Sequence, residues 1–153
     1  MIAGQVSKKY VAIVHGCPTP EDGTIDGPID RDPMEPHRRI VTKDGYPALT
    51  FYKVTQAVEQ ASLVELRLGT GRTHQIRVHM TSIGHPLIGD KMYQVNGVTD
   101  HREINSWIER QALHAVELGF KHPLTGVEML FTAPLPEDMT HLLYKLNLGG
   151  IQT

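Results

Sequence analysis

Short segments in which apolar and polar residues alternate, separated by turn residues, make up much of the chain. Residues 9–15 (KYVAIVH) and 62–68 (SLVELRL) show the alternation most clearly, and it is typical of half-buried β-strands. The strands expected from such patterns are residues 9–15, 38–42, 48–58, 62–68, 112–120 and 127–133. Strands joined by tight turns pair antiparallel, so the pattern disfavours a doubly wound α/β fold.

Two turns predict hairpins between these strands. Asp44-Gly45 follows the strand at 38–42 and precedes the one at 48–58, and glycine supplies the positive φ that a tight turn needs. Residues 122–126 (HPLTG) join the last two strands in the same way. The Pro- and Asp-rich residues 24–36 are expected to be irregular.

Helical periodicity appears in only a few places. Within residues 73–83, Ile76, Met80 and Ile83 recur at i, i+4 and i+7, and Gly84 is suited to cap the helix. A second helix is expected at 137–146. The predicted fold class is therefore α+β, with a mixed, mainly antiparallel sheet and a few helices.

Composition places the chain among ordinary globular proteins. Its 153 residues and 17.1 kDa correspond to one domain, expected to span 1–153. The net charge of −2 does not indicate a nucleic-acid-binding protein, because such domains are usually basic. Three arginines, Arg67, Arg72 and Arg77, are nevertheless concentrated within residues 63–89. The single cysteine, Cys17, favours a reducing cytoplasm. No apolar run approaches 18 residues, so no membrane association is expected.

Metal and nucleotide sites are weakly indicated. His74 and His79 are five residues apart, which directs them about 140° apart on a helix, and the zinc-protease spacing is absent. Residues 69–71 (GTG) lack the further glycine of a dinucleotide site, and a strand-to-helix turn with positive φ is the simpler interpretation. No metal or cofactor is expected.

Two residues, Arg77 and Tyr10, each allow a functional and a purely structural interpretation. Arg77 lies at the margin of the predicted helix's buried stripe, where it either reaches a carboxylate or phosphate or acts as an ordinary boundary arginine. Tyr10 alternates with Ala12 and Val14 along its strand, which by pattern alone favours simple packing.

Longer motifs carry a resemblance to a known family. Residues 68–90 (LGTGRTHQIRVHMTSIGHPLIGD) are similar to the signature segment of the RluA-type pseudouridine synthases, and residues 7–16 (SKKYVAIVHG) resemble that family's lysine–tyrosine strand. Further similar segments follow the family's order at residues 38–48, 111–115, 120–126 and 133–136. The match runs from about Val6 to Leu146.

The resemblance implies a pseudouridine-synthase-like fold and RNA chemistry without cofactor or metal. The family detaches uracil from its ribose, turns it and rejoins it through carbon in ribosomal or transfer RNA. An aspartate attacks, an arginine pairs with it and a tyrosine packs on the flipped base. Carried over, Arg77 and Tyr10 are the catalytic residues. The expected RNA contacts are Arg38, Arg39, Arg72, Thr73, His74 and Gln75.

One departure from the family limits the expected activity. The family's His-Arg-Leu-Asp segment upstream of the tyrosine strand is absent. Residues 37–40 (HRRI) and 101–104 (HREI) resemble it in part, but neither contains the aspartate. The chain is therefore expected to be a partial catalytic domain that is inactive alone, with Arg77 lacking its carboxylate. Association is expected, either as a homo-oligomer or with a missing N-terminal portion, through apolar surface around Val11, Ile13 and residues 63–68. The alternatives are a non-catalytic RNA-binding or regulatory module and, less favoured, an unrelated metal or nucleotide protein.

Overall fold

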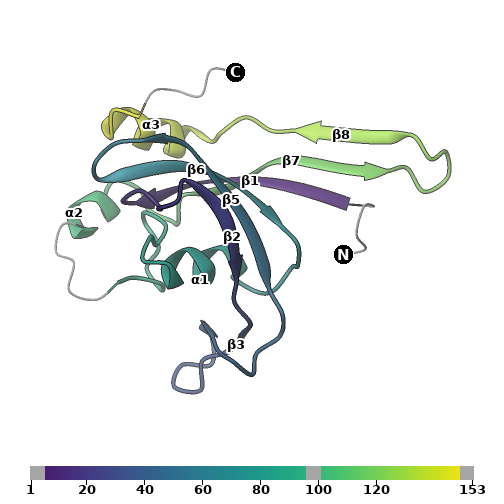
Figure 1. Cartoon of the computed structure of the whole chain (residues 1–153). Helices are drawn as coiled ribbons and strands as arrows, with labels where there is room; N and C mark the ends of the chain where they lie inside the picture. The colour runs from purple at the N-terminus through teal and green to yellow at the C-terminus, as the bar shows by residue number, and fades with distance from the viewer. Residues whose placement is uncertain (1–5, 96–100, 149–153) are drawn as a thin grey trace.

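The structure is a computed structural model that describes residues 6–95 and 101–148 (Figure 1). Its strands are β1 (Val6–His15), β2 (Asp22–Asp26), β3 (Ile29–Arg31), β4 (Arg39–Val41), β5 (Leu49–Ala57), β6 (Ala61–Leu68), β7 (Leu113–Lys121) and β8 (Glu128–Thr132). Its helices are α1 (Gln75–Ser82), α2 (His101–Asn105) and α3 (Glu137–Lys145). None of these helices has the length and apolar character needed to cross a membrane.

A six-stranded antiparallel sheet in the order β2-β5-β6-β1-β7-β8 organises the chain. The alternation along β1 determines what each face of this sheet buries, because successive side chains point to opposite faces. Ala12 and Val14 pack toward α1, whereas Val11 and Ile13 pack toward α3. Figure 1 shows these two helices on opposite sides of the sheet. The predicted α+β class with a mainly antiparallel sheet is confirmed.

The hairpin predicted across Asp44-Gly45 is wrong. Strand β4 pairs with β3 in a separate two-stranded sheet, whereas β5 pairs with β2 and β6. Residues 24–36, which were predicted to be irregular, therefore contain β3 and part of β2. The reason is long-range packing: Ile29 and Ala48 bury themselves against Val78 and Tyr93 in a small core of their own, which outweighs the local turn signal.

Helix α1 begins two residues later than predicted. His74 adopts a left-handed conformation, with φ of 56°, and a residue in that conformation cannot belong to a right-handed helix. Ile83 lies beyond the last turn and is exposed, so it does not extend the buried stripe. Gly84, with φ of +88°, ends the helix as predicted. Gly69 and Gly71 do not have positive φ, contrary to the expectation for that turn.

The apolar surface expected around Val11, Ile13 and Leu63 is buried, because β1 and β6 are the two central strands of the sheet. Exposed apolar side chains occur instead on the edge strand β8, where Leu130 is 63% and Phe131 50% exposed. The β7–β8 hairpin, joined by residues 122–126 as predicted, projects away from the helices (Figure 1). Part of the exposed apolar surface of the described residues therefore lies on this hairpin.

Candidate active site

Tyr10 lies on the β1 face that α1 covers and is half-buried there. The pairing register between β1 and β7 shifts between Lys9 and Tyr10. Such an irregularity redirects the side chains next to it and is frequent beside active sites. The ring of Tyr10 packs against the sheet at one side and borders an open hollow at the other.

Arg77 forms a bidentate ion pair with Asp90. Its Nε lies 2.8 Å from Asp90 Oδ2 and its Nη2 lies 2.9 Å from Oδ1. The arginine side chain is 14% exposed and the carboxylate is fully buried. The hydrogen bonds to Asp90 raise the pKa of Arg77 above its ordinary value. The expectation that Arg77 lacks a carboxylate is therefore wrong: the turn after α1 supplies one.

Asp90 is fully buried and accepts four hydrogen bonds, two of them from Arg77. Besides Arg77, its Oδ1 accepts the backbone N–H groups of Met92 and Tyr93, each at 3.0 Å. A buried carboxylate with these donors is a structural anchor. It holds the guanidinium of Arg77 in place while Nη1 has no hydrogen-bond partner within residues 6–95 and 101–148.

Tyr10 and Arg77 border the same hollow, which has a volume of about 370 Å³. Its lining residues are Tyr10, Leu68, Arg72, His74, Gln75, Ile76, Arg77, Gln111 and Leu113. Two of them are arginines, and no carboxylate of the described residues is among them. The hollow therefore offers an aromatic ring, apolar walls and positive charge, a combination that suits a planar base attached to a phosphate.

Tyr93 connects the predicted RNA-binding residues beneath the hollow. Its hydroxyl accepts the N–H of Arg39 at 2.8 Å and is hydrogen-bonded to Nδ1 of His74, also 2.8 Å away. The guanidinium carbons of Arg38 and Arg77 lie 5.2 and 5.0 Å from the centre of its ring, within cation–π range. This buried ring thus joins β4, α1 and the turn after α1.

His74 is held neutral by these surroundings. Burial first, and then the positive charges of Arg77 and Arg39, lower the pKa of His74 below its ordinary value. Its ring is hydrogen-bonded through Nδ1 to the hydroxyl of Tyr93. The backbone of His74 is left-handed, a conformation that few residues other than glycine adopt.

Gln75 supports the loop before α1 from inside the protein. It is buried, its Nε2 donates to Leu49 O and Thr50 Oγ1, and its Oε1 accepts from Thr70 and from the Arg72 N–H. Gln75 also lines the hollow, and its contact with RNA stays a prediction. Arg72 and Thr73 are exposed on the loop that Gln75 fixes.

Two functional positions were missed by sequence reasoning, namely the pairing role of Asp90 and the connecting role of Tyr93. The segment GDKMY places an aspartate three residues before the tyrosine, a spacing that permits the observed bond from the Tyr93 N–H to Asp90. The bond between Tyr93 and Asp90 could therefore have been predicted from the sequence. The contact of Asp90 with Arg77, which lies on the preceding helix, could not.

Metal binding finds no support in the described part of the chain, where no three His, Cys, Asp or Glu side chains converge. His74 and His79 instead have separate partners. His79 is buried with Nδ1 against Thr50 Oγ1 and Nε2 against Gly27 O.

Comparison with known proteins identifies the family to which the chain belongs. The family model described as RNA pseudouridylate synthase matches residues 1–82, which include β1 and α1. The chain belongs to this family. Within the pseudouridylate synthase family, it is 48% identical over 145 residues to the uncharacterized RNA pseudouridine synthase YlyB of Bacillus subtilis. It is 42% identical over 144 residues to ribosomal large subunit pseudouridine synthase D of Zymomonas mobilis.

These alignments cover 95% and 92% of this chain but 46% and 45% of the two relatives. The chain thus spans about half the length of the curated relatives that it matches. Among solved structures, human RNA pseudouridylate synthase domain containing 4 superposes with a TM-score of 0.72 and 27% identity. That match covers 93% of this chain and 62% of the human chain, and it supports the pseudouridylate synthase fold.

Proposed function

We propose that this chain forms the base-binding wall of an RNA pseudouridine synthase active site, which isomerises uridine to pseudouridine. The observation that carries the proposal is that Tyr10, from β1, and Arg77, from α1, border one hollow. Tyr10 stacks on the extruded uracil, and Arg77 provides positive charge at the reacting ribose and carboxylate. An enzyme acting on a base must take it out of the stack, and the open hollow gives it a place to go.

The nucleophilic carboxylate is proposed to come from outside the described residues. In this family an aspartate attacks, and covalent catalysis of this kind splits one difficult step into easier ones. The hollow has no carboxylate in its described lining, and Asp90, which is not part of that lining, is buried and bonded to Arg77 and the backbone. The chain alone is therefore expected to bind RNA without converting it.

A fusion experiment tests the proposed function. The upstream portion of the relative YlyB, which in this family carries the catalytic aspartate, is joined to residue 1, and pseudouridine in bulk RNA is measured by mass spectrometry. We expect the fusion to form pseudouridine and the isolated chain to form none. In the fusion, Tyr10→Ala is expected to reduce the rate by about 100-fold, because the base loses its positioning surface.

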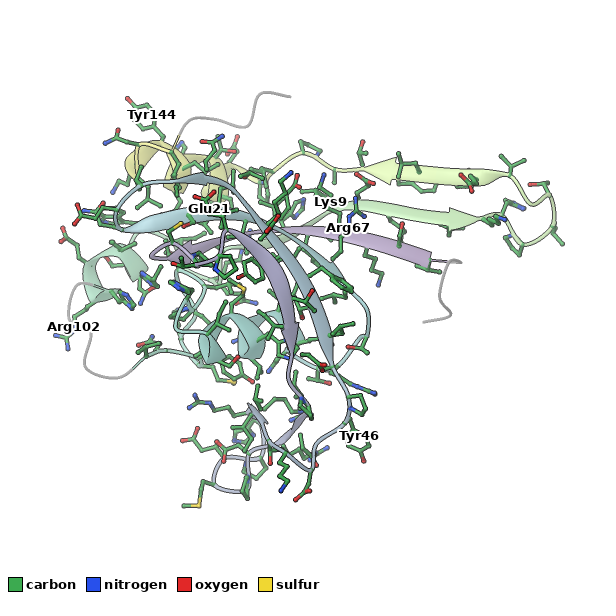
Figure 2. All side chains as sticks on the ribbon, in the orientation of Figure 1. Lys9, Glu21, Tyr46, Arg67, Arg102 and Tyr144 are labelled. Carbon is green, nitrogen blue, oxygen red and sulfur yellow. The ribbon has the colours of Figure 1, made fainter. Side chains whose placement is uncertain are left out.

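The control for this experiment is Arg102→Met, on α2 (labelled in Figure 2) and not among the residues that line the hollow, which is expected to leave the rate unchanged. Formation of pseudouridine by the isolated chain would contradict the assignment of the nucleophile. A folded fusion that binds RNA without forming pseudouridine would favour the alternative function, a non-catalytic RNA-binding or regulatory module derived from this family.

The RNA contacts are proposed to be phosphate contacts around the hollow. Arg72 and Thr73 are exposed on the loop before α1, and Arg38 and Arg39 contact Tyr93, whose hydroxyl is hydrogen-bonded to His74 of the hollow. Cations arranged around a base-sized hollow orient the backbone without reading sequence. Both ribosomal and transfer RNA are compatible with such contacts.

Association is proposed to involve the β7–β8 hairpin. Strand β8 is an edge of the sheet with unpaired backbone groups, and its exposed Leu130 and Phe131 add apolar surface. We expect sedimentation to give a mass above 17.1 kDa, and Leu130→Lys to shift it toward the monomer. Leu124→Lys is the control, because Leu124 is exposed but lies in the turn outside β8. A monomeric wild-type chain would refute this proposal.

A further inference from the structure

The ring of Tyr46 is exposed on a rigid backbone. The Tyr46 N–H donates to Ile29 O and the Ile29 N–H donates to Tyr46 O, both at 2.9 Å. Gly45 lies so close to Ile29 that a Cβ at this position would be 2.7 Å from the Ile29 carbonyl carbon. The backbone is thus pressed against β3, while the Tyr46 side chain remains 62% exposed. A large aromatic ring held outward in this way is a preformed flat surface.

Arg72 is fixed beside this ring. Its Nε donates to Pro47 O at 2.8 Å, and its guanidinium carbon lies 5.5 Å from the centre of the Tyr46 ring. The Arg72 N–H also donates to the buried Gln75. In the described part of the chain, the two terminal nitrogens of Arg72 have no hydrogen-bond partner. Because Arg72 lies over one face of the Tyr46 ring, these nitrogens are positioned to contact an anion while the exposed remainder of the ring is available to an aromatic group.

Arg72 also borders the hollow that contains Tyr10 and Arg77. One side chain therefore belongs both to that hollow and to the Tyr46 surface, so the two are continuous. Figure 2 shows Tyr46 at the end of the molecule that carries β3 and β4. A strand whose target base enters the hollow would pass over Arg72 and reach Tyr46 with a neighbouring nucleotide.

We propose that Tyr46 and Arg72 form a subsite for the nucleotide next to the target uridine, and this inference rests on the proposed function. The Tyr46 ring stacks on the neighbouring base, and Arg72 contacts the intervening phosphate. Stacking tolerates any base because each has a π-face, so the subsite contributes affinity and alignment with little sequence selection. Single-stranded RNA, with its unstacked bases, is the ligand that this combination fits.

The probe is a fluorescein-labelled oligouridine of about eight nucleotides, a length within the range of single-stranded sites. Anisotropy titrations of the 153-residue chain measure its affinity. Tyr46→Ala is expected to weaken binding about tenfold, and Tyr46→Phe to retain nearly full affinity because its ring still stacks. Tyr144→Ala is the matched control: Tyr144 is 84% exposed on α3, at the opposite end of the molecule in Figure 2, and no change is expected.

Two further measurements separate stacking from a structural role. Arg72→Gln is expected to reduce the slope of log affinity against log salt by about 0.7, the value for one phosphate on a single strand, whereas Tyr46→Ala leaves the slope unchanged. An oligonucleotide containing 5-iodouridine is expected to form a photo-crosslink to Tyr46, located by mass spectrometry.

The outcomes distinguish this subsite from the proposed function. Unchanged affinity of Tyr46→Ala, beside a Tyr10→Ala variant that binds weakly, overturns the subsite and leaves the function standing. A crosslink at Tyr144 instead of Tyr46 also overturns it. Absence of binding by the wild-type chain even at low salt overturns the RNA-binding function itself.

Discussion

Replacing Asp90 with alanine is expected to lower the free energy of unfolding by about 3–5 kcal/mol, because it leaves the guanidinium of Arg77 largely buried without its counter-charge. The substitution also removes the acceptor for two backbone N–H groups, those of Met92 and Tyr93. Urea denaturation followed by circular dichroism measures the change. Since Asp90 also positions Arg77, the same variant is expected to bind RNA more weakly than its stability loss alone explains.

The chain contains a matched control for this prediction. Arg110 and Asp138 form an ion pair of the same bidentate geometry, at 2.9 and 3.0 Å, but both side chains are about 40% exposed. Asp138→Ala is expected to cost no more than about 1 kcal/mol, because water solvates the charge that remains. An equal cost for the two substitutions would show that burial does not determine the contribution of the Arg77–Asp90 pair.

Acid is expected to destabilise the chain through His15. Burial, the largest cause, lowers the pKa of His15 from 6.5 to about 4. Its Nε2 donates to Asn105 Oδ1 at 2.7 Å, its ring stacks on His101 at 3.6 Å, and its buried Nδ1 has no partner within residues 6–95 and 101–148. The folded protein therefore favours the neutral form of the His15 imidazole.

The direction of the change in stability follows from the pH at which the folded and the unfolded chain each protonate His15. Between pH 6.5 and about 4 the unfolded chain protonates this histidine and the folded chain does not, so stability is greatest above that window and falls as the pH drops through it. At about 1.4 kcal/mol for each pKa unit, a shift from 6.5 to about 4 corresponds to a loss of about 3.5 kcal/mol. Buried His79, whose pKa is also lowered by burial, adds a loss of the same sign.

Denaturation measured above and below this window checks the prediction. His15→Gln is expected to be less stable at neutral pH and to show a correspondingly smaller loss on acidification. His141→Gln, at an exposed position on α3, is the control and is expected to keep the wild-type acid dependence. An acid dependence that is the same in His15→Gln and in the wild type would refute the assignment to His15.

Features that depend on neighbouring residues were readable from the sequence. Alternation predicted β1 and β6, and the turn at 122–126 predicted the β7–β8 hairpin, because period-2 burial and turn chemistry are local properties. The long motif at 68–90 indicated the family, which the family model confirms. The side of β1 on which Tyr10 lies also followed from alternation alone.

The remaining features were decided by tertiary structure. Whether β4 paired with β5 or β3 depended on a small core that unites Ile29 with Tyr93, far along the chain. The pairing of Arg77 with Asp90 depended on how the turn after α1 folds back on the helix. The left-handed backbone of His74, whose ring is hydrogen-bonded to Tyr93, keeps this residue out of α1. Sequence periodicity indicated the buried face of β1, whereas the choice of partner among buried charges and strands depends on distances that only the folded chain establishes.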